Sequence, residues 1–78
     1  MKPTAEEIQA LVRRQLGLYE VGLEDDFAAD LGAVSADIIN IIAALEDLYT
    51  VVIGEEELPD IRTVEQLHRL VCERVKAR

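Results

Sequence analysis

Two capping boxes, one near each end of the chain, constrain the fold more than any other sequence feature. In such a box, a Ser or Thr and a Glu or Gln three residues later satisfy free backbone N–H groups at the start of a helix. Residues 4–7 (Thr-Ala-Glu-Glu) and 63–66 (Thr-Val-Glu-Gln) both fit, and apolar residues at helical spacing follow each box. These are Ile8, Leu11, Val12 and Leu16 after the first, and Leu67, Leu70, Val71 and Val75 after the second. With Gly17 as a stop signal, the sequence predicts a first helix up to residue 16 and a last helix from about residue 63.

A third long helix is predicted between Ser35 and Tyr49. Its buried stripe would comprise Ile38, Ile41, Ile42, Leu45 and either Leu48 or Tyr49. The β-branched run at 38–42 is also compatible with a strand, but the unbroken pattern up to residue 48 has the length of a helix. Further apolar residues widen the stripe, so this helix is either wholly buried or presents part of itself to another molecule.

The remaining segments connect these helices. Residues 18–34 form a long loop, which we expect to be ordered because apolar residues can pin it to the core; these are Leu18, Val21, Leu23, Phe27 and Leu31. Residues 51–53 read as an extended connector, and residues 55–58, between Gly54 and Pro59, as one short helical turn. The prediction is an all-α monomer in which residues 1–78 form one domain with three longer helices and one short helix.

The charge of the chain is unevenly distributed. The net charge is −8, and residues 15–61 contain twelve carboxylates and no Lys or Arg. Such a region repels nucleic acid and anionic membranes and attracts basic protein surfaces, although a solvated acidic face is the simpler interpretation. A single cysteine excludes an internal disulfide, and the sequence contains no apolar run of about 20 residues and no signal peptide. We expect a soluble, cytoplasmic protein.

Few residues suggest catalysis or metal binding. His68 and Cys72 stand four apart, a spacing that suits a metal site or a thiol–imidazole pair, but further ligands are missing. The simpler interpretation is a buried cysteine beside a surface histidine. Asp25, Asp26 and Asp30 lack the spacing of a calcium-binding EF-hand loop. The sequence therefore predicts neither an enzyme nor a metal site.

Ser35 is the one remaining candidate, and two interpretations of it are open. A serine at this position can be the N-cap of the helix, accepting a hydrogen bond from a backbone N–H two or three residues later. Alternatively its hydroxyl can carry a phosphodiester, because the helix dipole and the free N–H groups favour an anion there. The sequence pattern alone favours the cap.

The surroundings of Ser35 resemble a known family. Residues 26–37 read Asp-Phe-Ala-Ala-Asp-Leu-Gly-Ala-Val-Ser-Ala-Asp, similar to the region of acyl carrier proteins that receives phosphopantetheine: a Phe, then Asp-Leu-Gly, then Asp-Ser-Leu. Residues 44–47 resemble the end of that family's recognition helix, residues 54–57 its short acidic helix, and residues 61–64 the beginning of its last helix. The resemblance covers nearly the whole chain and implies a four-helix bundle.

This resemblance implies a function. A phosphopantetheinyl transferase would attach 4'-phosphopantetheine from coenzyme A to Ser35, and the arm would hold acyl groups as thioesters for fatty-acid, polyketide or specialised biosynthetic enzymes. Acidic residues would meet basic patches on these partners; they are Asp37, Glu46, Asp47, Glu55, Glu56 and Glu57. An apolar shelter for the acyl chain would involve Ile39, Ile42, Ala43 and Ile53. Because both ends stop at the domain edge, we expect a discrete carrier rather than part of a synthase.

The chain departs from the family pattern beside the serine. Val34 replaces the family's Asp and Ala36 its Leu; further along, Asn40 replaces a frequent acid and Ala43 a frequent Met. The first two positions flank the modification site, which predicts slow loading by a general transferase. The alternative function is an acidic docking module that keeps the fold and carries no arm.

Overall fold

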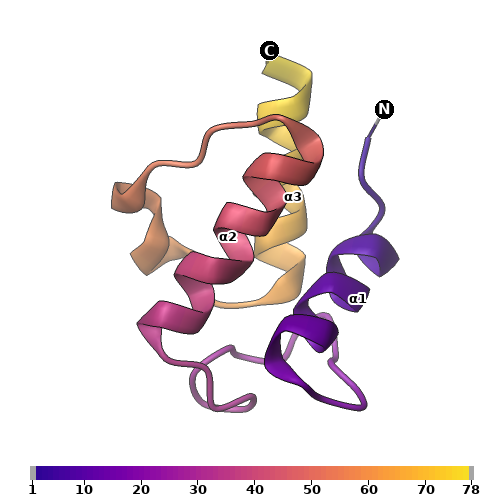
Figure 1. Cartoon of the computed structure of the whole chain (residues 1–78), viewed down its shortest axis with the longest axis vertical. Helices are drawn as coiled ribbons and strands as arrows, with labels where there is room; N and C mark the ends of the chain where they lie inside the picture. The colour runs from indigo at the N-terminus through magenta and orange to yellow at the C-terminus, as the bar shows by residue number, and fades with distance from the viewer. Residues whose placement is uncertain (1, 78) are drawn as a thin grey trace.

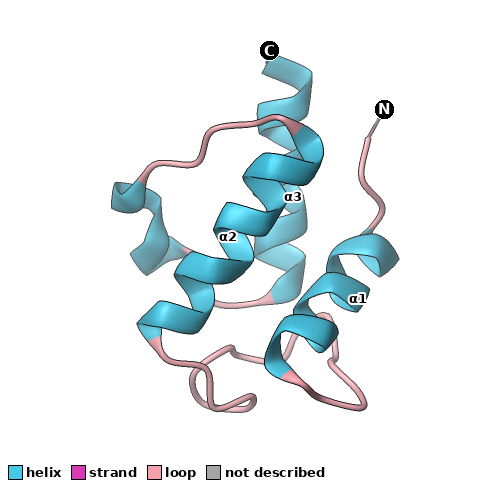
Figure 2. Cartoon of the chain, viewed as in Figure 1, coloured by secondary structure: helices cyan, strands magenta, loops and turns pink. Residues whose placement is uncertain are grey.

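The computed structural model describes residues 2–77 and consists of helices joined by ordered connections. The elements are α1 (Ala5–Leu16), α2 (Ser35–Tyr49), the 3₁₀ helix η1 (Glu55–Asp60) and α3 (Val64–Ala77). Residues 2–77 contain no strand, only an isolated bridge between Asp26 and Thr63. The three long helices pack against one another, and η1 lies on the side of α2 away from α1 (Figures 1 and 2). The predicted all-α architecture of three longer helices and one short helix is confirmed.

The first capping box forms as predicted. The Glu7 backbone N–H donates to Thr4 Oγ1 at 3.1 Å, and the Thr4 N–H donates to Glu7 Oε1 at 2.9 Å. Gly17 ends α1 in the left-handed conformation, with φ of 67°, which a glycine adopts without steric cost.

The second box is half formed. The Gln66 N–H donates to Thr63 Oγ1 at 3.2 Å, but Gln66 Oε1 accepts from the N–H of Arg62, at 2.7 Å, and not from that of Thr63. The backbone of Thr63 takes part in the bridge to Asp26, and this tertiary pairing places the Arg62 N–H within reach of the Gln66 side chain. The predicted hydrogen bond from the Thr63 N–H to the Gln66 side chain is therefore wrong, because the donor is the preceding residue, Arg62.

The core is aliphatic and draws on all three long helices. Its fully buried side chains are Ile8 and Val12 of α1, Ile41 and Leu45 of α2, and Val64, Leu67 and Val71 of α3. No polar or charged residue is buried among residues 2–77, so the core gains its stability from apolar burial alone. No helix in this range combines the length and apolar character needed to cross a bilayer.

The structure decides the open points about α2. The segment 38–42 is helical, so the strand alternative is wrong. Tyr49 rather than Leu48 completes the buried stripe: Tyr49 packs against the core, and burial raises the pKa of its hydroxyl, while Leu48 is 62% exposed. Ile39 is 47% exposed, so α2 does present apolar surface to solvent.

The connections are ordered and partly buried. Val21 and Phe27 anchor the loop between α1 and α2 in the core, with Leu18 and Leu31 packed against it, whereas Leu23 is exposed. The connector after α2 is extended as predicted, and its first and third residues, Val51 and Ile53, are buried. The loop crosses the end of the bundle where α1 finishes and α2 begins (Figure 1).

Two leucines on α2 provide a matched test of this core. Leu45 is fully buried and Leu48, one turn later, is 62% exposed. We expect Leu45→Ala to lower the free energy of unfolding by about 2–5 kcal/mol through lost burial and a residual cavity, and Leu48→Ala by less than about 0.5 kcal/mol. Chemical denaturation measures both, and equal losses would contradict the arrangement of α2.

Candidate functional site

Ser35 is the first residue of α2 and its side chain is exposed. The N-cap is Val34, which makes no side-chain cap hydrogen bond, and Asp37 Oδ2 accepts from the Val34 N–H at 3.0 Å. The interpretation of Ser35 as the N-cap is therefore wrong, because the helix begins one residue later than that interpretation requires. The signal in the sequence was Asp37, the acidic half of a capping box counted from Val34. The hydroxyl of Ser35 is thus not used as a cap.

A chain of backbone hydrogen bonds positions the segment that leads into Ser35. The Phe27 N–H donates to the carbonyl of Arg62 at 2.8 Å, and the Ala33 N–H donates to the carbonyl of Phe27 at 2.8 Å. Phe27 and Ala33 are both buried, and Gly32 between them has φ of 67°, a left-handed conformation that favours glycine. The residues before Ser35 are therefore held between the core and the residues that precede α3.

The carboxylate of Asp26 organises the same loop. Its Oδ1 accepts from the N–H groups of Ala28 and Ala29, each at 2.9 Å, and its Oδ2 pairs with the guanidinium of Arg62. The N–H donated by Ala29 is the main reason that the pKa of Asp26 is lowered, and the N–H of Ala28 and the nearby Arg62 lower it further. Asp30 Oδ2 also accepts a hydrogen bond from the Asp26 N–H at 2.8 Å. The carboxylates of Asp26 and Asp30, two of the three considered for calcium, therefore bind backbone N–H groups of their own loop.

Two grooves adjoin Ser35. One, of about 230 Å³, lies toward η1 and is lined by Ser35, Ile38, Leu58, Pro59 and Ile61. The other, of about 200 Å³, lies toward the loop and is lined by Asp26, Phe27, Ala28, Ala33, Val34, Ser35, Ile38, Ile61 and Arg62. The exposed Ser35 hydroxyl lies between an apolar groove and a more polar one. This arrangement fits a flexible arm that has a charged group at its attachment point and an apolar group at its far end.

None of the four residues expected to shelter an acyl chain lines these two grooves. Ile42 and Ile53 are buried in the core, and Ile39 and Ala43 face solvent. The apolar lining of the groove toward η1 comes instead from Ile38 of α2 and from the segment 58–61. Helical periodicity could not place that segment, because its position depends on how η1 folds back toward α2.

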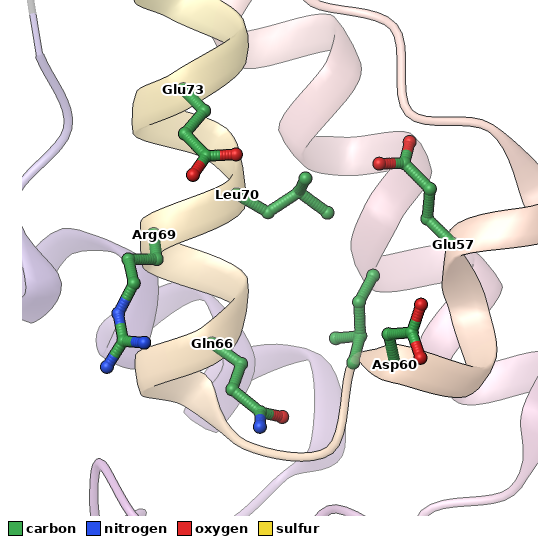
Figure 3. A pocket seen from close by; sticks show the side chains of 7 residues that line it. Glu57, Asp60, Gln66, Arg69, Leu70 and Glu73 are labelled. Carbon is green, nitrogen blue, oxygen red and sulfur yellow. The ribbon is translucent and has the colours of Figure 1, made fainter.

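A third groove lies between η1 and α3, with a volume of about 260 Å³. Ile61 lines it together with the residues labelled in Figure 3: Glu57 and Asp60 from the η1 side, and Gln66, Arg69, Leu70 and Glu73 from α3. Three carboxylates line it and Ser35 does not, so we do not assign it to the arm.

Comparison with known proteins identifies the family. The family model for a phosphopantetheine attachment site matches residues 6–71, most of the chain. The chain belongs to the acyl carrier protein family. An acyl carrier protein of Trieres chinensis is 38% identical over 66 residues, covering 82% of each chain. One of Phaeodactylum tricornutum is 36% identical over 69 residues, covering 86% of this chain and 91% of the relative.

A chloroplastic acyl carrier protein of Brassica napus is 37% identical over 78 residues, which cover 96% of this chain and 58% of the relative. These relatives are named as carriers rather than catalysts. The chloroplastic relative also means that the cytoplasmic location expected from the sequence stays a prediction.

The structure separates the six acidic residues expected to bind partners into two groups. Three are half-buried and hold the fold: Asp37 accepts from Val34, Glu46 Oε2 accepts from the Ile53 N–H at 2.9 Å, and Glu57 accepts from the Gly54 N–H at 3.1 Å and pairs with Arg74. The others, Asp47, Glu55 and Glu56, are exposed.

His68 and Cys72 form a structural contact with the N-terminal segment. His68 Nε2 lies 3.0 Å from the Pro3 carbonyl oxygen, so this nitrogen must carry the proton, because a carbonyl only accepts. Cys72 Sγ lies 3.4 Å from the same nitrogen and 3.6 Å from the same oxygen. An Nε2 that already donates cannot take the thiol proton, and residues 2–77 contain no cluster of ligands for a metal. Both residues are half-buried, so the cysteine is less buried and the histidine less exposed than the sequence predicted.

The Glu57–Arg74 pair fixes η1 to α3, and its contribution should depend on pH. The hydrogen bond from Arg74 lowers the pKa of Glu57 below its usual value of 4.5, with help from the Gly54 N–H. Because the folded pKa is lowered, the pair stabilises the fold above pH 4.5 and loses this contribution as the pH falls through the folded pKa.

We therefore expect Arg74→Gln to lower the free energy of unfolding by about 1 kcal/mol at neutral pH, with the loss vanishing in acid. Denaturant titrations across the acid range test this. The matched control is Arg69→Gln, which removes the more exposed pair with Glu65 and should cost less. A cost for Arg74→Gln that persists unchanged after Glu57 is protonated would contradict the assignment.

Proposed function

We propose that Ser35 carries a 4'-phosphopantetheine arm on which this protein holds acyl groups as thioesters. The supporting observation is the exposed Ser35 hydroxyl at the first residue of α2, free of a capping role and placed between two grooves. In loading, Ser35 Oγ forms a bond to the phosphorus of coenzyme A that bears the pantetheine, and the bond from that phosphorus to adenosine 3',5'-bisphosphate breaks. The serine proton passes to a base of the transferase. The chain itself supplies the hydroxyl and its presentation, and the bound arm supplies the thiol.

The groove toward η1 is the proposed shelter for the apolar part of an acyl group. Ile38, Leu58, Pro59 and Ile61 line it next to the attachment atom. Covering an acyl chain there removes apolar surface from water, at about 25 cal/mol per Å². This proposal replaces the sequence-based expectation that placed the shelter around Ile39 and Ile42.

The proposed partners are a phosphopantetheinyl transferase and acyl-processing enzymes with basic docking surfaces. Asp47, Glu55 and Glu56 supply exposed negative charge on α2 and η1, which raises association rates more than affinity. Asp37, Glu46 and Glu57 contribute to the same field from half-buried positions. Residues 1–78 would act as one carrier domain, serving fatty-acid, polyketide or specialised biosynthesis.

The second candidate function is an acidic docking module without an arm. It is favoured by the surface beside the serine, where Val34 is 62% exposed and Ala36 is also exposed. A transferase that offers basic groups to an acid at position 34, and an apolar pocket to a leucine at position 36, would find neither. The two functions differ in one observable, the modification of Ser35.

Loading kinetics test the proposed attachment site. We expect a broad-specificity transferase to add one phosphopantetheinyl group to the wild-type protein slowly, and to load the double variant Val34→Asp, Ala36→Leu tens of fold faster. The extra buried methyl and methylene groups alone are worth on the order of 2 kcal/mol in the transition state. Intact mass over time measures the rates. Ser35→Ala is the control: it should not be loaded, and it should unfold at nearly the wild-type temperature because Ser35 makes no cap.

Two outcomes would contradict this. Loading of Ser35→Ala would show that the attachment site lies elsewhere. Equal rates for the wild type and the double variant would show that Val34 and Ala36 do not limit recognition.

A charge reversal tests the docking surface. We expect Asp47→Lys to slow association with the same transferase several-fold at low ionic strength, with the difference fading as salt screens the charges. Glu24→Lys, the same charge change at an exposed loop position, is the matched control and should have a smaller effect. Stopped-flow association rates measure both, and equal slowing by the two variants would remove Asp47 from the interface. Glu46→Lys is unsuited to this test, because it would also release the Ile53 N–H.

A further inference from the structure

Among residues 2–77, Arg62 is the one cation that lines either of the two grooves beside Ser35. The sequence has no Lys or Arg between residues 15 and 61, and Arg62 is the first basic residue after that acidic stretch. It lines the loop-side groove of about 200 Å³ together with Val34 and Ser35. Its position therefore places a guanidinium in the same groove as the hydroxyl proposed to carry the arm.

The fold holds this guanidinium in place without using all of its donors. Nε and Nη2 of Arg62 each lie 3.2 Å from Asp26 Oδ2. Asp26 is itself fixed by the N–H groups of Ala28 and Ala29, and the backbone of Arg62 is fixed by the Phe27 N–H. A guanidinium has five N–H donors and this pair uses two of them. The Arg62 side chain is 70% exposed, so the remaining donors are accessible to a second anion.

An arm on Ser35 would bring such an anion. Its phosphodiester carries one negative charge. Two acidic residues are near it in the fold or the sequence: Asp26 lines the same groove, and Asp37 follows Ser35 by two positions on α2. Val34, which lines the same groove, is uncharged and therefore does not neutralise the guanidinium of Arg62. Arginine suits phosphate oxygens because its planar set of donors can bond two of them at once.

We propose that Arg62 binds the phosphodiester of the arm and holds the root of the arm on the loop side of α2. Arg62 is then a positioning residue: it leaves the apolar groove toward η1 free for the acyl group. The loop-side groove would thus bind the phosphodiester, and the groove toward η1 would bind the apolar acyl group. This proposal rests on the proposed function, since it requires an arm at Ser35.

Nuclear magnetic resonance on the loaded protein tests the contact directly. Apo protein labelled at its arginine side chains is loaded with coenzyme A and a broad-specificity transferase, and intact mass confirms the addition. We expect the Arg62 Nε–H resonance to shift on loading, while that of Arg69 does not. Arg69 is the matched reference, because its side chain is also 70% exposed and also paired with a carboxylate.

Phosphorus resonance of the arm gives the second readout. We expect Arg62→Gln to move the phosphodiester signal of the loaded protein, Arg69→Gln to leave it unchanged, and Arg62→Lys to restore it in part. A role of Arg62 only in holding Asp26 would change stability without this pattern.

The proposal is overturned if the protein is loaded but the Arg62 Nε–H does not shift, or if both glutamine variants move the phosphorus signal equally. In either case the proposed function stands, because the mass shows the arm. If no variant or wild-type protein gains the arm, the proposed function fails and this proposal fails with it. Should Arg62→Gln not fold, the wild-type comparison of Arg62 with Arg69 decides alone.

Discussion

The burial and backbone pairing of Phe27 is the interaction on which the rest of the site depends. The residue is 2% exposed, its N–H donates to the carbonyl of Arg62 ahead of α3, and its carbonyl accepts from the N–H of Ala33, two residues before Ser35. One residue thus ties the long loop to the core, to the start of α3 and to the start of α2. Ordering a loop of this length costs conformational entropy, and such loops are uncommon in compact domains. Here the anchored loop holds Ser35 and the guanidinium of Arg62 at the same groove.

The acidic character of the chain serves two purposes that composition alone does not separate. Asp37 and Glu57 each accept a backbone N–H where α2 or η1 begins, and Glu46 accepts one at the end of the connector that follows α2. Glu57 thereby holds the start of η1, the helix that supplies Leu58 and Pro59 to the groove beside Ser35. Asp47, Glu55 and Glu56 remain exposed and repel one another and nucleic acid. If the exposed carboxylates bind partners as proposed, such binding would leave the hydrogen bonds of the fold intact.

Local patterns predicted the helices well, and tertiary contacts account for what they missed. The first capping box, Gly17 and the 3.6-residue spacing of buried residues act within one or two turns, so the sequence shows them directly. The shift of Gln66 to the Arg62 N–H, the choice of Tyr49 over Leu48 and the groove formed by Ile38 and Pro59 depend on segments distant in sequence. The sequence pattern favoured Ser35 as the N-cap, and that interpretation failed because Asp37 caps α2 from inside the helix. The modification of Ser35, like the docking residues, stays a prediction.

The central claim is that Ser35 carries the arm in the cell, and the mass of the protein purified from its native host tests it most directly. We predict an intact mass higher than that of the unmodified chain by one phosphopantetheinyl group, with or without an acyl group, and a proteolytic fragment that places the addition on Ser35. A native population that has only the mass of the unmodified chain would contradict the account and would favour the acidic docking module.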